Sequence, residues 1–479
     1  MGLGPVGAAL ANLLGAMGIA TIVVERWPTH YSMPRAVHFD DEAMRLLQTI
    51  GIADEMAPDL IVNKGMRFVT KSGELLIDWP RPQQLGPLGW YPSYRFYQPQ
   101  LEMALRRKLG EYPGVSVIYQ AEVTDVTAHD AGVTLQWHDI ASQTQGTIEC
   151  EFVVGCDGAR SQMRDWIGGG MEDLGCDQDW LVVDVVANRP LEHLSDWTLQ
   201  YCDPARPTTT ARGPGLRRRW EFMVMPGDDR ATLTEPAQVW RLLERWITPA
   251  DAVIERAAVY QFHALLAHDW RAGRLLIAGD AAHQTPPFLG QGLCAGLRDA
   301  VNLAWKLAAV VRGHAAPALL DTYQSERKPH ARAFLHEALR LGAVLQATDA
   351  EAEARQGTMA RAPVRMASIR PLLGPGLHGD APAPAGAIFP QPVLSDGRRF
   401  DDAVGINFAL YAGAEWLQSL PDSLNALLAK AGIVVVAVPD DDNILLELDA
   451  RAVVVRPDRA ILGVAKDARR LLELVALIG

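Results

Sequence analysis

Apolar positions in this chain form either short continuous runs or helical repeats. The run Leu275 to Ala278 lies between two glycines and predicts a buried strand. A long helix is predicted from about Gln291, and Gly313 is placed to end it as a C-cap. Apolar residues of this helix recur in steps of three and four and predict one buried face: Leu293, Leu297, Ala300, Val301, Ala304, Leu307, Ala308 and Val311.

An aspartate and several glycines occupy the segment between that strand and that helix. Asp280 directly follows the strand, at the sheet edge where open α/β proteins bind their ligands. Pro287, Gly290, Gln291 and Gly292 lead into the helix, where backbone N–H groups can approach a ligand at the positive end of the helix dipole. A flat, electron-rich ligand such as a flavin ring suits this position. An ordinary strand–loop–helix unit with a capping aspartate is the alternative, and this stretch alone does not separate the two.

The first residues of the chain carry a second glycine pattern. Gly2, Gly4 and Gly7 fit G-x-G-x-x-G and open a helical stretch, and residues 21–24 predict the strand that follows it. That strand ends in Glu25, close to the spacing of about 20 residues at which a carboxylate binds the ribose of a dinucleotide. A solvated strand end is the alternative interpretation of Glu25.

The glycine fingerprint requires a buried strand before its first glycine, and the printed sequence starts at the glycines. We therefore expect residues upstream of Met1 in the natural protein, because a GTG codon read as an initiator also gives Met. Otherwise the domain folds without its central strand. A mass spectrum of the native protein that ends at Met1 or Gly2 would refute the expectation.

Four further residues carry polar side chains beside predicted elements. Arg35 and His38 precede a helix that begins near Asp41, and Gln98 lies at the start of another helix. Asp157 and Gly158 follow a predicted strand and form a common turn pair. Each has an ordinary explanation as a surface contact, a cap or a turn.

Two sheets are predicted between residues 115 and 225. The first is a small antiparallel sheet of residues 115–119, 121–127 and 133–137, and the second contains residues 181–186, 197–201 and 220–225. The basic run Arg217 to Arg219 predicts a solvated hairpin face, or alternatively a surface that attracts an anionic substrate or nicotinamide cofactor.

The last part of the chain predicts a separate unit. Residues 319–345 are largely helical, and residues 371–392 hold six prolines and four glycines, which is typical of a linker. Beyond the linker the predicted order is strand, helix, three strands and a closing helix, which is thioredoxin-like. This segment has no cysteine, so thiol exchange is excluded and a docking or dimerisation role is expected.

Composition limits the class of protein. The formal net charge is −12, which gives no electrostatic case for nucleic acid or an anionic membrane. Five cysteines form no CxxC pair and no metal spacing, and without a secretion signal they indicate reduced thiols in a cytoplasm. Residues 2–24 are uncharged, but glycines interrupt them and no basic residue precedes them, so we expect no membrane segment.

Three motifs together resemble a known family: GLGPVG with Glu25, CDGARS at 156–161, and GDAAHQTPPFLGQG at 279–292. From Gly2 to about residue 345 the chain is similar to the group A FAD-dependent aromatic monooxygenases, of the para-hydroxybenzoate and phenol hydroxylase type. The segments PRAVHFDDEAMR, YCDPARPTT and RRWEFMVMPG look most like 3-(3-hydroxyphenyl)propionate (3-hydroxycinnamate) hydroxylases of the phenol hydroxylase branch. Relatives in this family act on resorcinols, other phenols and polyketide rings.

The resemblance implies a role for each matching residue. Gly2, Gly4, Gly7 and Glu25 would hold the ADP half of FAD, Arg35 and Gln98 would reach the ribityl and phosphate region, and Asp157 with Gly158 would serve FAD and the nicotinamide cofactor. Asp280 would bond the ribityl chain, and Pro287, Gly290, Gln291 and Gly292 would line the isoalloxazine. His38 would help to deprotonate the phenol. No metal site is expected.

The resemblance also implies an α/β fold: a Rossmann-like FAD-binding domain (1–175 and 271–345, first strand missing), an inserted mixed-sheet substrate domain (176–270), a helical segment and linker (346–392), and a thioredoxin-like domain without redox cysteines (393–479). The implied reaction consumes NADH or NADPH and O2 and converts a phenolic acid to a catechol through a flavin C4a-hydroperoxide. We expect a phenolic substrate and a homodimer. The alternatives are a hydroxylase of another phenol, resorcinol or polyketide ring, a flavin dehydrogenase that does not use O2, and a binding protein without its cofactor.

Overall fold

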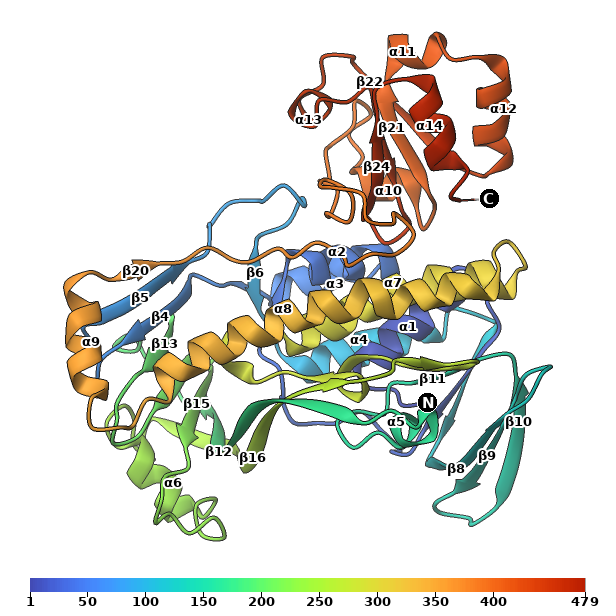
Figure 1. Cartoon of the computed structure of the whole chain (residues 1–479). Helices are drawn as coiled ribbons and strands as arrows, with labels where there is room; N and C mark the ends of the chain where they lie inside the picture. Colours follow the sequence, from blue (N-terminus) through green and yellow to red (C-terminus); the bar gives the residue numbers. More distant parts are fainter. Residues whose placement is uncertain (479) are drawn as a thin grey trace.

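A layer of helices runs through the middle of the molecule (Figure 1). The computed structural model describes residues 1–478. The layer contains α1 (Pro5–Ala16), α4 (Gln98–Leu109), α7 (Gly292–Val311) and α8 (Asp321–Leu345). Helices α1 and α7 approach closely because Gly296 lies where a Cβ would come within 2.6 Å of Val6 Cγ2. The helix predicted from about Gln291 is thus confirmed, with Gly313 just beyond its end at φ +70°.

Below this layer lie two separate pieces of parallel sheet. β1 (Thr21–Glu25) pairs in parallel with β7 (Val115–Tyr119), and β11 (Val153–Gly155) pairs in parallel with β18 (Leu275–Ile277). The prediction that residues 115–119 belong to the small antiparallel sheet is wrong. That sheet contains only β8 (Ala121–Ala128), β9 (Val133–Asp139) and β10 (Gln145–Cys150). A distant parallel partner leaves no local pattern in the sequence, which explains the error.

An apolar groove separates the two pieces of parallel sheet. It encloses about 1840 Å³, its open side included, between β1 and β11. Met1 and Gly2 close one end: the Met1 amino group donates to Val154 O (2.9 Å), Cys156 N donates to Met1 O (2.8 Å), and Gly2 N donates to Val24 O (2.8 Å). No strand lies in this groove among residues 1–478. The expectation of residues upstream of Met1 stays a prediction.

A large mixed sheet forms the second layer, in the strand order β19-β16-β12-β15-β14-β13-β4-β5-β20. One of its faces packs on α6 (Pro236–Leu243), and the other faces the helices. It draws strands from well outside residues 176–270. Its strands are β4 (Gly65–Val69), β5 (Leu75–Pro80), β12 (Met171–Ala187), β13 (Thr198–Tyr201), β14 (Thr208–Arg212), β15 (Arg217–Met223), β16 (Ala252–Ala267), β19 (His283–Gln284) and β20 (Val364–Arg365).

The basic run Arg217 to Arg219 lies in β15, and its interpretation as a solvated face is wrong for its last residue. Arg219 is buried and forms two hydrogen bonds to Asp184 (2.7 and 2.9 Å). It also donates to the carbonyl oxygens of Pro34 and Arg35. Arg219 therefore joins the large sheet to the loop that precedes β2 (His38–Asp40).

Short elements connect these layers. They are α2 (Asp41–Ile50), α3 (Ala53–Met56), β3 (Ile61–Val62), β6 (Ser93–Arg95), α5 (Gln162–Ile167), β17 (Arg271–Ala272) and α9 (Ala352–Arg361). No helix among the described residues is both long enough and apolar enough to cross a membrane.

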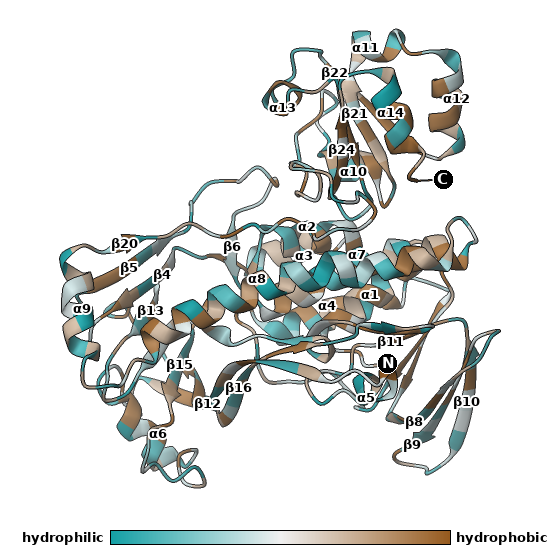
Figure 2. Cartoon of the chain, viewed as in Figure 1, coloured by the Kyte–Doolittle hydropathy of each residue, from teal (hydrophilic) through white to brown (hydrophobic). Residues whose placement is uncertain are grey.

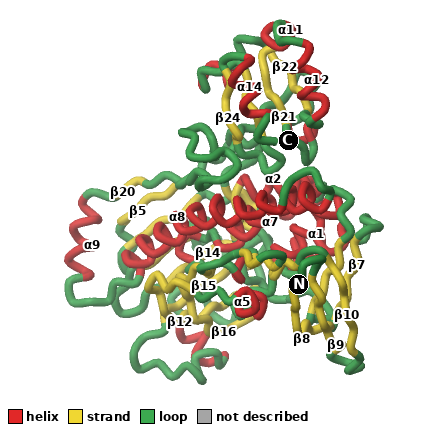
Figure 3. Tube along the Cα trace, turned by 45° about the vertical axis from the view of Figure 1, so that its right-hand side comes forward, coloured by secondary structure: helices red, strands yellow, loops and turns green. Residues whose placement is uncertain are grey.

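The C-terminal unit stands apart from the two layers (Figures 1 and 3). Its sheet has the order β22-β21-β23-β24, with β21 parallel to β22 and antiparallel to β23. Figure 2 shows hydrophobic residues along these strands, beneath more polar helices. The elements are α10 (Phe400–Val404), β21 (Ala409–Gly413), α11 (Ala414–Gln418), α12 (Asp422–Lys430), β22 (Val434–Val438), α13 (Asn443–Glu447), β23 (Ala452–Val455), β24 (Ile461–Ala465) and α14 (Ala468–Val475).

A buried ionic network joins this unit to the helix layer. Arg456, just after β23, donates to Glu326 of α8 (2.8 and 2.7 Å), and Lys306 of α7 donates to the same carboxylate (2.7 Å). Asp458 accepts from Arg456 (2.6 Å) and from Asn302 (2.9 Å). Burial lowers the pKa of Lys306 to about 8. Fully buried charges of this kind are stable only while each keeps its partners.

Candidate active site

The N-termini of α1 and α7 open onto one cleft. The cleft encloses about 2030 Å³, its open mouth included, and is lined by Gly4, Pro5 and Val6 of the first helix and by Gly292 and Leu293 of the second. Neither helix has a side-chain cap or an acidic residue in its first turn. Two sets of backbone N–H groups and two positive helix ends are therefore free to meet an anionic ligand. We call this space the cofactor cleft.

Most of the predicted cofactor residues line this cleft together. They are Gly2, Gly4, Glu25, Arg35, Gln98, Asp157, Gly158, Asp280, Pro287 and Gly292. Gly7 instead borders the apolar groove, and Gln291 borders a second pocket described below. Gly290 lies in the same turn at φ +69°. Residues from five separate stretches of the sequence thus meet in one place.

Three of the polar residues in the cleft already form hydrogen bonds to other residues of the chain. Glu25 accepts from the N–H groups of Leu3 (2.5 Å) and Trp27 (2.9 Å). Gln98 accepts from Ala36 N (2.7 Å), and Asp157 accepts from Ser161 Oγ (2.6 Å). These contacts fix the loops around the cleft. Each carboxylate oxygen retains a second lone pair, so a ligand hydroxyl can still bind there.

Asp280 is different, because its carboxylate makes no hydrogen bond to any residue that the structure describes. It lies at the head of the cleft, just after β18, with its side chain exposed to the cleft, and partial desolvation by the surrounding protein raises its pKa. A carboxylate that is partly desolvated and still unpaired favours a ligand that donates hydrogen bonds to it, as a sugar-alcohol chain does.

Two glycines of the first motif allow a close approach of the backbone. A Cβ on Gly7 would lie 2.1 Å from Gly2 O, and one on Gly2, at φ +88°, would lie 2.5 Å from Cys156 O. A Cβ on Gly4 would meet nothing within 4 Å, so Gly4 faces open space in the cleft. The sequence reasoning missed Gly296, whose spacing of four from Gly292 was the available signal for close helix packing.

The donor set of the cleft fits FAD. A diphosphate suits the uncapped start of α1, a ribityl chain suits Asp280, and an electron-rich ring edge suits the N-terminus of α7. Arg35 adds an exposed cation at the rim, where its guanidinium stacks on Tyr31 at 4.6 Å. The volume is ample for a dinucleotide.

His38 lies buried behind the turn that begins α7. Its Nδ1 donates to Gly290 O (2.9 Å), and its Nε2 accepts from Ser93 Oγ (2.7 Å), which in turn accepts from Asn63. Burial, together with the nearby charge of Arg95, lowers the pKa of His38 to about 3. These contacts describe a neutral imidazole that holds the Gly290 turn in place. Its catalytic role stays a prediction.

A second pocket, the His38 pocket, lies against the same turn. It encloses about 440 Å³, its mouth included, and Leu289 and Gln291 of the turn line it. Arg81 lies in this pocket with only 9% of its surface exposed, and its guanidinium stacks on Trp79 at 3.9 Å. Arg81 Nη1 is buried without a hydrogen-bond partner among the described residues, and burial lowers the Arg81 pKa to about 10. Nothing in the sequence near Arg81 signals this position.

A glycine-lined cleft at two helix starts, set between a parallel sheet and a large mixed sheet, defines the class of FAD-dependent aromatic hydroxylases. The family described as "FAD binding domain" matches residues 1–338. The chain belongs to this family of FAD-binding monooxygenases.

Two curated relatives are similar in sequence. A probable NADH-specific resorcinol 4-hydroxylase of Rhodococcus jostii is 35% identical, with 100% of this chain and 94% of the relative covered. A 3-(3-hydroxy-phenyl)propionate/3-hydroxycinnamic acid hydroxylase of Burkholderia vietnamiensis is 42% identical over 73% of this chain and 63% of the relative.

Solved structures share the fold over the whole chain. Aklavinone-11 hydroxylase, crystallised with FAD and aklavinone, has a TM-score of 0.81 at 23% identity and covers 100% of this chain and 97% of its own. The flavin-dependent monooxygenase PieE has a TM-score of 0.84 at 21% identity with the same coverage. The predicted α/β FAD-binding hydroxylase fold is therefore confirmed.

Proposed function

We propose that this protein hydroxylates a phenolic acid such as 3-(3-hydroxyphenyl)propionate to a catechol, with consumption of NADH or NADPH and O2. The observation that carries the proposal is Arg81, a buried cation beside an aromatic side chain, in a pocket lined by the same 287–292 turn that borders the cofactor cleft. The Burkholderia relative, whose name gives a phenolic acid as substrate, supports the same choice.

The charges around Arg81 favour an acidic substrate. Asp40 and Glu42 are both paired with Arg298, at 2.6 and 2.7 Å, and Asp41 is paired with Arg370 at 2.5 Å. Arg81 has no carboxylate within ion-pair distance among the described residues. A buried guanidinium without a partner is costly, and a substrate carboxylate with a bidentate contact would relieve that cost.

FAD, when bound, supplies the activation of O2 and receives electrons from the nicotinamide cofactor. The chain's own residues bind, orient and exclude water. The N–H groups at the start of α7 would stabilise negative charge on a bound flavin, and Asp280 would hold its ribityl chain. His38 holds Gly290 in the geometry that these N–H groups require. Phe262 borders the cleft and packs with Trp180 and Phe288, which keeps water from the ring.

Substitution of Arg81 tests the proposal. In Arg81→Gln the KM for 3-(3-hydroxyphenyl)propionate should rise by roughly 10- to 100-fold, the usual loss for a charged hydrogen bond, while the KM for neutral resorcinol stays unchanged. Arg67→Gln is the matched control, because Arg67 lies on the same β4–β5 hairpin and also stacks on a tryptophan, Trp197, at 3.8 Å. Equal KM values for the acid in Arg81→Gln and the parent would remove Arg81 from substrate binding.

Resorcinol hydroxylation is the second candidate. The Rhodococcus relative matches this chain from end to end, including the C-terminal unit, and its name supports NADH as the reductant. Turnover of resorcinol with no turnover of phenolic acids would favour it. NADH oxidation without matched O2 uptake would instead favour a dehydrogenase.

Further parts of the assignment are proposals of the same kind. The proposed domain limits are 1–175 and 271–345 for the FAD-binding domain, 176–270 for the substrate domain, 346–392 for the helical segment and linker, and 393–479 for the C-terminal domain. The strand order β22-β21-β23-β24, with its mixed directions, supports a thioredoxin-like C-terminal domain. We propose a cytoplasmic enzyme and a homodimer, for which sedimentation of the FAD-loaded protein is the test.

A further inference from the structure

A cavity lies where the C-terminal unit meets the helix layer. It encloses about 860 Å³, its mouth included, and neither the FAD cleft nor the His38 pocket accounts for it. Its walls come from α1, α2, α7 and α8 on one side and from the linker and the β23–β24 turn on the other. Most of the lining is apolar: Leu13, Leu46, Leu297, Val301, Trp305 and Ile406. We call this space the arginine cavity.

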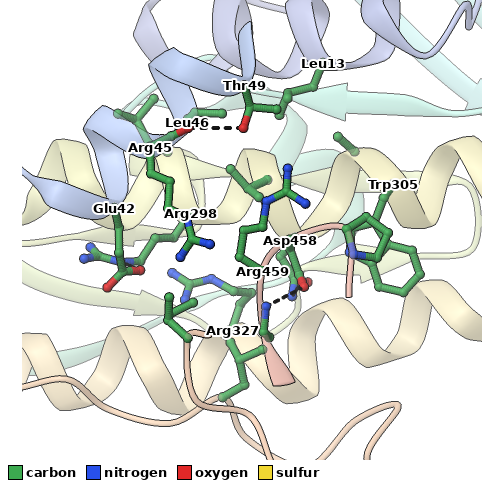
Figure 4. A pocket seen from close by; sticks show the side chains of 18 of the residues that line it. Leu13, Glu42, Arg45, Leu46, Thr49, Arg298, Trp305, Arg327, Asp458 and Arg459 are labelled. Atoms are coloured by element: carbon green, nitrogen blue, oxygen red, sulfur yellow. Dashed lines mark hydrogen bonds and ion pairs between the residues drawn. The ribbon is translucent and has the colours of Figure 1, made fainter. Parts of the chain in front are cut away.

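Four arginines and two acids line this otherwise apolar space. Figure 4 shows the four side chains reaching into it from different elements. The arginines are Arg45, Arg298, Arg327 and Arg459, and the acids are Glu42 and Asp458. Other ion-pair partners of these arginines lie outside the lining: Asp40, Asp299 and Asp401.

Three of the four guanidinium groups are held in direct ion pairs. Arg298 is paired with Asp40 and Glu42, and Arg327 is paired with Asp299 at 3.0 Å. Arg45 forms two hydrogen bonds to Asp401 (2.6 and 2.7 Å) and a third to a carbonyl oxygen. Asp458 is likewise taken by Arg456 and Asn302.

Arg459 is the exception. It is 5% exposed, and Nη2 donates to Gly405 O (2.8 Å), while Nε lies 3.2 Å from the Asp401 carboxylate that Arg45 already uses. Nη1 is buried without a hydrogen-bond partner among residues 1–478. One carboxylate, that of Asp401, thus serves two arginines, and Arg459 is the guanidinium of the four with the fewest hydrogen bonds. Burial lowers the pKa of Arg459, which reflects the cost of this arrangement.

The backbone of Arg459 adds a second observation. Its φ is +68°, in the left-handed region that glycine or asparagine occupies more easily. The turn from Arg456 to Ala460 closes through two backbone hydrogen bonds, Arg456 N to Ala460 O (2.8 Å) and Arg459 N to Arg456 O (2.9 Å). An arginine in such a position costs roughly 1 kcal/mol or more. A ligand that binds the Arg459 guanidinium would offset this conformational cost.

We propose that the arginine cavity binds a small organic carboxylate with an aromatic body, and that Arg459 Nη1 donates to its carboxylate. The apolar walls accept the ring, and the unpartnered Arg459 donor gains an acceptor without the removal of any existing ion pair. Trp305 lies in the wall and stacks edge-on with Phe408 at 5.3 Å, so it reports on occupancy through its fluorescence. The site also touches α7 at Arg298, which lines the His38 pocket as well.

Benzoate is the probe, and its neutral isostere benzamide is the comparison. The FAD-loaded, full-length protein is titrated by calorimetry and by tryptophan fluorescence, and the flavin absorbance is recorded to detect binding in the active site. We expect saturable benzoate binding without a flavin change, and at least about tenfold weaker binding of benzamide. Binding should persist in Arg81→Gln, which separates this site from the proposed substrate contact.

Two variants of different kinds test the assignment. Arg459→Gln removes the free donor, and Val301→Phe fills the apolar space with Arg459 intact; each should weaken benzoate binding at least about tenfold. Arg469→Gln is the control, because Arg469 is 90% exposed in the same unit. Unchanged benzoate affinity in both variants, absence of binding in the parent, or loss of binding only in Arg81→Gln would overturn the proposal. None of these readouts depends on hydroxylation, so the proposed function stands or falls separately.

Discussion

The cofactor cleft and the arginine cavity lie along the same helix, α7, and differ in how their polar groups are paired. In the cleft the free groups are backbone N–H groups of two uncapped helices and the carboxylate of Asp280. In the cavity nearly every charge is held in an ion pair, and two nitrogens of one guanidinium, Arg459 Nε and Nη1, are buried without a hydrogen-bond partner among the described residues. The difference teaches that an open site can leave many groups unpaired because water satisfies them, whereas one unpaired group in a buried site is informative.

The largest expected effect concerns the buried ion pairs between the helix layer and the C-terminal unit. Glu326→Gln leaves Lys306 and Arg456 without their shared carboxylate, and the free energy of unfolding should fall by about 3–5 kcal/mol. Urea titration of the FAD-loaded protein measures it. Glu337→Gln, which breaks a partly exposed pair with Arg340 in the same helix, should cost no more than about 1 kcal/mol. Similar losses in both variants would remove the contrast between the buried and open regions.

The next effect lies in the cleft. Asp280→Ala should weaken FAD binding by roughly 10- to 100-fold, because the free carboxylate is the group that accepts the ligand's hydroxyls. Fluorescence titration of the FAD-free protein measures the Kd. Asp130→Ala, on an exposed loop, is the control and should leave the Kd unchanged. An unchanged Kd in Asp280→Ala would mean that the backbone of the two helices alone determines affinity.

The smallest expected effect concerns His38, which is buried and forms hydrogen bonds through both ring nitrogens. Because the folded pKa of about 3 lies below the ordinary value of 6.5, only the unfolded chain takes up this proton between those limits. The His38 contribution is present in full above pH 6.5 and declines by at most about 1.4 kcal/mol per unit as the pH falls towards 3.

Denaturant titrations at pH 7.5, 6.5 and 5.5 test the sign. The stability difference between the parent and His38→Gln should shrink as the pH falls below 6.5. His314→Gln, at an exposed site after α7, should show no such trend. A difference that stays constant down to pH 5.5 would contradict a depressed His38 pKa.

Local patterns predicted most of the elements, and distant pairings explain what they missed. The glycine fingerprint, Glu25, Asp280 and the long helix were all readable, because each follows a fixed spacing or period. The parallel pairing of β7 with β1 joins residues about a hundred positions apart, so no local signal exists. Arg219 looked solvated because its partner Asp184 lies on another strand. Arg81 and Arg459 are notable only for partners they lack, which a sequence does not display.

The groove beside β1 has a practical consequence for anyone who fuses a sequence to the amino end. The Met1 amino group donates to Val154 O, and the Gly2 N–H donates to Val24 O. Residues added before Met1 would therefore lie between the facing edges of β11 and β1. A short run of β-branched residues would extend the sheet there, whereas an imidazole-rich affinity tag would press polar rings against Leu10 and Leu14. The side-chain chemistry of any residues joined to Met1 therefore decides whether this groove accepts them.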